Sequence, residues 1–207
     1  MRSPAIPSSP RSLRDDLRGV VGLLFGFVAV LWTVEIVDQA IFAGALDQFG
    51  LVPRSVTGLL GLATAPLLHG GFGHLLGNTI GLVLLGGLTL AIGRREFFAV
   101  TAAGFVLGGL GTWIFGRSAV HIGASGLVFA YLGFLLLRGW YDRRPGPIVL
   151  SLLVAWFQGG MLMGMIPGVT PPGISWEGHL FGFLAGALIA AKASRLQAKL
   201  NHHRSMV

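Results

Sequence analysis

The sequence contains no cysteine, which excludes disulfide bonds, thiolate metal sites and a cysteine nucleophile. Charged residues are also scarce: they make up 11% of the 207 residues, whereas 53% are hydrophobic. Since about a quarter of an ordinary soluble domain is charged, this composition is typical of a protein embedded in a bilayer. The net charge of +7 would indicate an anionic partner for a soluble protein. Here the positions of the charges indicate topology instead, and we expect no nucleic-acid partner.

Six apolar runs of roughly spanning length are bounded by charged residues or by Pro/Gly clusters. They fall near residues 19–38, 73–92, 96–115, 123–138, 146–166 and 177–192. The segment 39–72 is apolar but is interrupted by Gly and Pro, so we expect short helical turns at the membrane interface there. The sequence therefore predicts an all-α, six-span membrane domain over residues 19–192, flanked by basic tails at residues 1–18 and 193–207.

Basic residues alternate between the connections of this domain. All but two of the 15 lie in the tails, in the segments that follow the second and fourth runs, or at the last residue of the fourth and sixth runs. The exceptions are Arg54 and Arg117. The positive-inside rule therefore places both termini in the cytoplasm and the first, third and fifth connections outside. The compact form, with no added domain, favours the plasma (inner) membrane of a bacterium.

Small residues recur every three or four positions on the fourth and sixth runs. Gly126, Ala130 and Gly133 form such a stripe on the fourth run, and Gly182 and Gly186 form one on the sixth. Because lipid supplies no hydrophobic force that drives helices together, close backbone packing between small residues is a main source of helix association. We expect these two stripes to face each other.

Polar side chains at membrane depth are costly and indicate function. His74 and Asn78 begin the second run, Ser125 begins the fourth and His179 begins the sixth. These three runs all start outside in the predicted topology, so the four residues are expected at similar depth. An imidazole, with a pKa of about 6.5, can take the proton of a serine hydroxyl. Ser125 and His179 are therefore the candidate nucleophile and general base.

The surroundings of Ser125 suit acyl transfer. Gly123 and Gly126 leave its backbone open, and the start of a helix presents free N–H groups to a developing oxyanion. His74 and Asn78 are four residues apart, so they share one helical face and both can donate hydrogen bonds to that oxyanion. An obvious third acid is missing, which predicts a Ser–His dyad.

Three motifs carry a resemblance to a known family: His74-Leu-Leu-Gly-Asn78, Gly123-Ala-Ser125-Gly126 and His179-Leu-Phe-Gly182-Phe-Leu-Ala-Gly186. In order and spacing they resemble the rhomboid family of intramembrane serine proteases. The resemblance implies a rhomboid-like six-helix bundle that cuts transmembrane segments of other membrane proteins without a metal or cofactor.

The resemblance also implies roles for individual residues. Ser125 would attack the peptide bond, and His179 would act first as base and then as acid. The oxyanion hole would consist of His74, Asn78 and the Ser125 N–H. His69 is expected in a structural role, and Phe129, where the family often has Tyr, is expected to stack on His179.

Other functions are possible from the sequence. A rhomboid-like protein without protease activity would bind membrane clients, but it would have lost the dyad. A metal-dependent protease could use His69, His74, His121 and His179, although no His-Glu-x-x-His motif is present. A small transporter would show internal repeats, which are not evident. The sequence does not indicate an oligomeric state.

Overall fold

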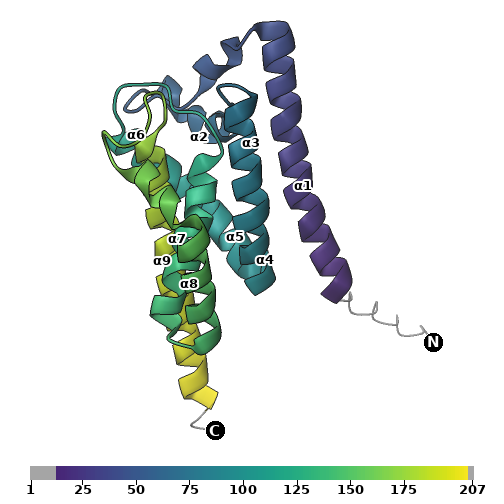
Figure 1. Ribbon diagram of the computed structural model, residues 1–207, viewed down its shortest axis with the longest axis vertical. Helices are drawn as coiled ribbons and strands as arrows, with labels where there is room; N and C mark the ends of the chain where they lie inside the picture. The colour runs from purple at the N-terminus through teal and green to yellow at the C-terminus, as the bar shows by residue number, and fades with distance from the viewer. Residues whose placement is uncertain (1–12, 205–207) are drawn as a thin grey trace, which may run out of the picture.

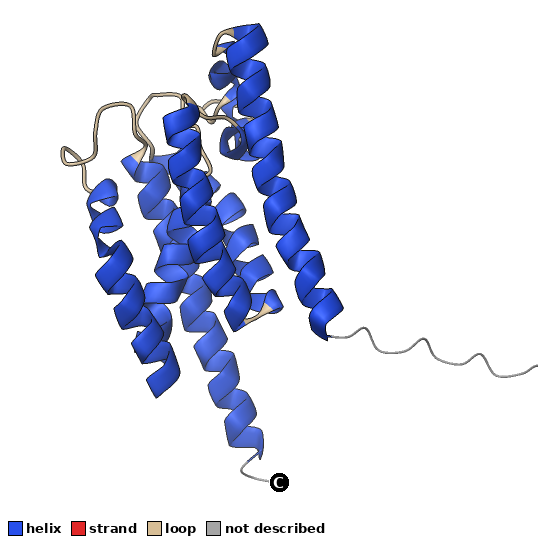
Figure 2. Cartoon of the chain, turned by 45° about the vertical axis from the view of Figure 1, so that its right-hand side comes forward, coloured by secondary structure: helices blue, strands red, loops and turns tan. Residues whose placement is uncertain are grey.

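A computed structural model describes residues 13–204 of the chain. Within these residues the protein is a bundle of helices without a strand (Figure 2). Leu51 and His121 form an isolated backbone bridge. Four helical stretches are long and apolar enough to cross a membrane: Val21–Phe42, Phe72–Ile92, Arg94–Phe115 and Pro145–Met165. The chain is therefore a multi-pass membrane protein.

The helices are α1 Leu13–Val37, α2 Gly61–Thr64, α3 Phe72–Gly81, α4 Gly87–Ile92, α5 Arg94–Ala103, α6 Gly109–Phe115, α7 Ser125–Asp142, α8 Pro145–Gln158 and α9 Trp176–Arg204. The longest connections between the helices follow α1 and α8. Single π turns, Leu82–Gly86 and Gly104–Gly108, connect α3 to α4 and α5 to α6. Short 3-10 turns at Ala45–Phe49, Thr57–Leu59 and Ala65–Leu67 confirm that the segment 39–72 does not form a continuous span.

The fourth and sixth predicted spans correspond to α7 and α9, which are not among the four apolar stretches. Helix α7 carries Arg138 and Asp142 in its last turns, and α9 begins with a glutamate and ends in a basic segment. The six-span count therefore remains a prediction. Helix α7 lies at the centre of the bundle, where α8 and α9 pack against it, so neighbouring helices cover much of its surface (Figure 1).

The two predicted tails are partly helical. Helix α1 already begins at Leu13, and α9 continues past residue 192 to Arg204. The rest of both tails lies outside the described residues. Helix α1 begins and α9 ends at the same end of the bundle, opposite the first loop (Figure 1). This arrangement agrees with termini on one side of the membrane, and which side that is remains a prediction.

Helices α7 and α9 approach each other through the predicted stripes of small residues. A Cβ atom on Gly182 would collide with the backbone carbonyl of Gly126, and one on Gly186 would collide with that of Ala130. On α7, a Cβ on Gly133 would collide with the carbonyl of Phe183 in the same way. The predicted packing is confirmed, and it leaves no room for side chains at these positions.

Three carboxylates lie close together where α1 meets the first loop. Glu35 accepts a hydrogen bond from Gln39 and Asp38 accepts one from the N–H of Leu46, at 3.1 and 3.0 Å. Asp47 lies close enough to both carboxylates to feel their charge. Burial first, and then these two neighbours, raise the pKa of Asp47 from 3.8 to about 6.

The raised pKa predicts that acidification stabilises this corner of the fold. Folded Asp47 holds its proton up to about pH 6, so its contribution is complete below the unfolded value of 3.8 and is lost as the pH rises through about 6. The melting temperature in detergent should therefore fall as the pH rises from about 4 to about 6. Asp47→Asn, which stays neutral, should raise the midpoint at neutral pH by a few degrees and flatten this slope. Equal slopes for variant and wild type would contradict the prediction.

Candidate active site

The structure brings Ser125 and His179 into contact. Ser125 is the first residue of α7 and His179 lies in the first turn of α9, and their Oγ and Nε2 atoms are 2.9 Å apart. The other ring nitrogen, Nδ1, lies 2.8 Å from the carbonyl oxygen of Gly164. Because a carbonyl can only accept, Nδ1 carries the hydrogen and Nε2 is left to accept the serine hydroxyl proton. This is the tautomer that a general base requires.

The Gly164 carbonyl occupies the position where a triad has its acid. Sequence reasoning missed it, because a backbone carbonyl has no side-chain signature and Gly164 lies in the Gly/Met-rich 3-10 turn Gly159–Met165. A Cβ atom on Gly164 would lie 3.2 Å from His179 Nδ1 and 3.3 Å from Phe129 Cζ. Glycine at this position therefore lets the turn approach the imidazole closely.

Phe129 stacks on His179 as predicted. Their ring centroids are 4.1 Å apart, and the planes are inclined by 8°. Phe129 lies one helical turn after Ser125, so α7 supplies both the hydroxyl and the flat surface behind the imidazole. With Gly164 at its Nδ1 edge, the ring of His179 is held on two sides.

This stack predicts the effect of two substitutions. Phe129→Ala removes the surface that holds the imidazole, and we expect the rate of cleavage of a transmembrane substrate to fall roughly ten-fold to 100-fold. Phe129→Tyr keeps the stack and adds only a hydroxyl, so it should stay within a few-fold of wild type. Equal losses of cleavage rate in the two variants would show that the rate does not depend on the stack of residue 129 on His179.

His74 and Asn78 lie on α3, beside the backbone that precedes Ser125. A Cβ on Gly123 would lie 2.7 Å from His74 Nε2 and 3.3 Å from Asn78 Nδ2, so both side-chain nitrogens point at this glycine. His74 Nδ1 accepts the N–H of Gly70 at 3.4 Å, which makes Nε2 the donor. Asn78 Nδ2 is buried and has no hydrogen-bond partner among the described residues. Both groups are thus available to an oxyanion next to Ser125.

Gly123 itself has a φ of 107°, a backbone conformation that L side chains rarely adopt. A side chain here would be strained, and it would also displace His74 and Asn78. This glycine, two residues before Ser125, therefore serves both the turn into α7 and the space in front of the His74 and Asn78 side chains.

His69 is fully buried behind this group. Its Nε2 accepts the N–H of Ala124 at 3.4 Å, and its ring meets that of His74 edge to face at 5.1 Å. Burial, and secondarily the neighbouring His74, lower the pKa of His69 to about 4. A neutral imidazole that supports the chain just before Ser125 fits the predicted structural role.

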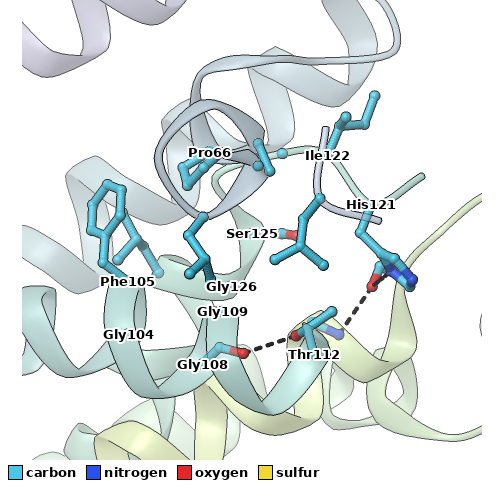
Figure 3. Close-up of a pocket in the computed structure, with 18 residues that line it drawn as sticks. Pro66, Gly104, Phe105, Gly108, Gly109, Thr112, His121, Ile122, Ser125 and Gly126 are labelled. Carbon is cyan, nitrogen blue, oxygen red and sulfur yellow. Dashed lines mark hydrogen bonds between the residues drawn. The ribbon is translucent and has the colours of Figure 1, made fainter. Parts of the chain in front are cut away.

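Two small cavities adjoin Ser125. One, of about 60 Å³, is shown in Figure 3 with Ser125 and Gly126 of α7, Pro66 of the first loop and Phe105 of the π turn around it. The other, of about 20 Å³, is lined among others by Ser125, His179 and His74, and it has room for about one water molecule. Ser125 thus lines hollow space.

Each of the histidines considered as metal ligands has a ring nitrogen with another partner. His121 contacts Ser175 and the Arg117 carbonyl, whereas His179 contacts Ser125 and Gly164. Among residues 13–204, no three His, Asp or Glu side chains are grouped so that they could hold a metal ion.

Comparisons with known proteins agree with this geometry. A family model described as the Rhomboid domain matches residues 56–196. An uncharacterized protein of Mycobacterium tuberculosis is 40% identical in an alignment of 205 positions, which covers 95% of this chain and 84% of that protein. The Bacillus subtilis protein named "Putative rhomboid protease YdcA" is 30% identical in an alignment of 132 positions, which covers 62% of this chain and 64% of that protein. This chain belongs to the rhomboid family.

Proposed function

We propose that the protein is an intramembrane serine endopeptidase that cleaves transmembrane segments of other membrane proteins through a dyad of Ser125 and His179. One observation supports this proposal most: the 2.9 Å contact between Ser125 Oγ and His179 Nε2, on an imidazole whose Nδ1–H is held by a carbonyl. Such an arrangement prepares the serine hydroxyl for deprotonation.

The reaction follows from the positions of these groups. His179 Nε2 takes the hydroxyl proton while Ser125 Oγ bonds to the scissile carbonyl carbon. The oxygen of that carbonyl becomes an oxyanion and accepts hydrogen bonds from His74, Asn78 and the Ser125 N–H. When the C–N bond breaks, His179 gives its proton to the leaving nitrogen. A water molecule, deprotonated by the same imidazole, then hydrolyses the acyl-serine ester and restores the hydroxyl.

The substrate class follows from the location of the site. Ser125 is the first residue of α7, in a bundle with four helical stretches that are long and apolar enough to cross a membrane (Figure 1). We infer that a segment of another membrane protein reaches it from the bilayer. A spanning helix hides its peptide bonds in backbone hydrogen bonds, so it must unwind locally before attack. The cavity of about 60 Å³ beside Ser125 favours a small side chain next to the scissile bond.

The test is cleavage and labelling in liposomes. Purified protein is reconstituted with single-span model substrates that carry small residues near one end, and a fluorophosphonate probe is added to parallel samples. We expect cleavage, covalent labelling that peptide mapping assigns to Ser125, and loss of cleavage in proportion to labelling. Substrates that bind without being cut, together with no labelling, would favour a client-binding protein instead.

We also propose that the protein lies in a bacterial plasma membrane with Ser125 near the outer face. Most basic residues lie on one side of the membrane in the predicted topology, which supports this orientation. The absence of cysteine makes it directly testable, because a single introduced thiol is unique. Ser118→Cys should react with an impermeant maleimide on intact cells, whereas Arg143→Cys should react only after lysis. The reverse pattern would contradict the orientation.

A further inference from the structure

The loop 116–123 is joined to the start of α9 by an ion pair. The backbone N–H and Nη1 of Arg117 donate to the two carboxylate oxygens of Glu177, at 3.1 and 3.2 Å, and Nη2 donates to the carbonyl of Ile174 at 2.7 Å. Glu177 is only 1% exposed, although the side chain of Arg117 is 43% exposed. A buried carboxylate needs its partner, so Glu177 ties the first turn of α9 to this loop.

A second contact links the same two segments. His121 Nδ1 and Ser175 Oγ are 2.6 Å apart, and His121 Nε2 lies 3.1 Å from the carbonyl oxygen of Arg117. Ser175 also caps α9, because its Oγ accepts the N–H of Gly178 at 3.0 Å. The backbone of His121 is paired in both directions with Leu51 in the first loop. His121 is therefore fixed, and it holds the cap of α9.

These contacts lie in register with the dyad. Ser175 lies four residues before His179, and His121 lies four residues before Ser125. The His121–Ser175 and Ser125–His179 contacts therefore join residues with the same separation along the chain, 54 positions. The two segments that are joined by the His121–Ser175 contact therefore also meet four residues further on, at Ser125 and His179. The His121–Ser175 contact thus restricts how His179 can align with Ser125.

We propose that Arg117, His121, Ser175 and Glu177 are positioning residues, which set the distance and orientation between His179 and Ser125. This inference rests on the proposed protease function. It gives Glu177, otherwise explained as an acidic residue near a helix N-terminus, a specific task. The four residues act indirectly, by holding α9 and the segment that leads into α7 in place. A small shift of either segment matters, because displacement of a reacting group by about 1 Å can cost roughly 100-fold in rate.

The test compares Ser175→Ala, Ser175→Thr and Glu177→Gln with wild type in liposomes. Ser175→Ala removes the hydroxyl that caps α9 and meets His121, whereas Ser175→Thr keeps it. Glu177→Gln keeps the shape of the side chain and removes the ion pair. Ser118→Ala serves as the control, since Ser118 is exposed in the same loop and its hydroxyl accepts a hydrogen bond from Arg54 of the first loop, at 3.4 Å. For each variant, kcat, KM and the rate of fluorophosphonate labelling are measured well below its melting temperature.

We expect Ser175→Ala and Glu177→Gln to lower kcat and the labelling rate together, by roughly ten-fold to 100-fold, with KM within about two-fold of wild type. Ser175→Thr should recover most of the loss. Wild-type kcat in both Ser175→Ala and Glu177→Gln would overturn the inference, as would equal losses in Ser175→Ala and Ser175→Thr. If Ser175→Ala does not fold, Glu177→Gln decides by the same criterion. An inactive, unlabelled wild type would instead refute the protease function itself.

Discussion

Ser125→Ala should lose cleavage of a transmembrane substrate to background, a fall of roughly 10⁴-fold or more. The methyl group cannot form the acyl ester, and the 2.9 Å contact with His179 Nε2 disappears. Folding should be preserved, because Ser125 is only half-buried and alanine is smaller. The measurement is product formation in liposomes over hours, together with fluorophosphonate labelling, which should also vanish. The exposed Ser118 offers a matched control, since Ser118→Ala should both cleave and label.

His179→Ala tests the other half of the dyad. When two residues act as one unit, removal of either one loses about as much activity as removal of both. Ser125→Ala, His179→Ala and the double variant should therefore be similarly inactive. Two single losses that multiplied in the double variant would indicate independent roles. Cleavage that survives Ser125→Ala would show that another group attacks the peptide bond.

Gly186→Ala should destabilise the bundle more than alanine at any other glycine of the α7–α9 interface. Its Cβ would collide with the carbonyl of Ala130, and a backbone atom cannot move aside as a flexible side chain can. Overpacking of this kind costs about 1–3 kcal/mol and sometimes more. Separation of α7 from α9 would also move His179 away from Ser125, so activity should fall along with the melting temperature.

Gly77→Ala is the matched control for this substitution. Gly77 lies on the exposed side of α3, and a Cβ there would meet nothing within 4 Å. Alanine is favoured over glycine in a helix by up to about 1 kcal/mol, so this variant should be as stable as wild type or slightly more so. Thermal unfolding in detergent and cleavage in liposomes measure both effects. An unchanged midpoint for Gly186→Ala would show that the two helices can separate without cost.

The positions that the sequence could predict are those where a side chain, or its absence, carries the information. The close approach at Gly182 and Gly186 and the shared helical face of His74 and Asn78 follow from residue type and helical spacing, which the sequence displays directly. The pairing of Ser125 with His179 was predicted from their chemistry and from their similar depth in the predicted topology. The stack of Phe129 on His179 was implied by the resemblance to the rhomboid family.

The remaining features depend on contacts between distant segments. The Gly164 carbonyl at His179 has no signature in the sequence, because any residue carries a carbonyl. The pairing of Glu177 with Arg117 spans 60 positions, and neither residue type indicates the other. The length of α9 was also underestimated, because the polar residues after position 192 ended the apolar run while the helix itself continued.

The number of residues in the π turn Leu82–Gly86 affects the direction of His74 and Asn78, the two proposed oxyanion donors. A π turn accommodates one residue more than the α-helix around it, and each residue corresponds to a rotation of about 100°. The phase of Phe72–Gly81, which carries His74 and Asn78, is therefore offset from that of α4. Removal of any one residue from the turn would rotate these donors away from Gly123 while leaving every remaining side chain unchanged. In this part of the protein, insertions and deletions are a harsher test of function than substitutions.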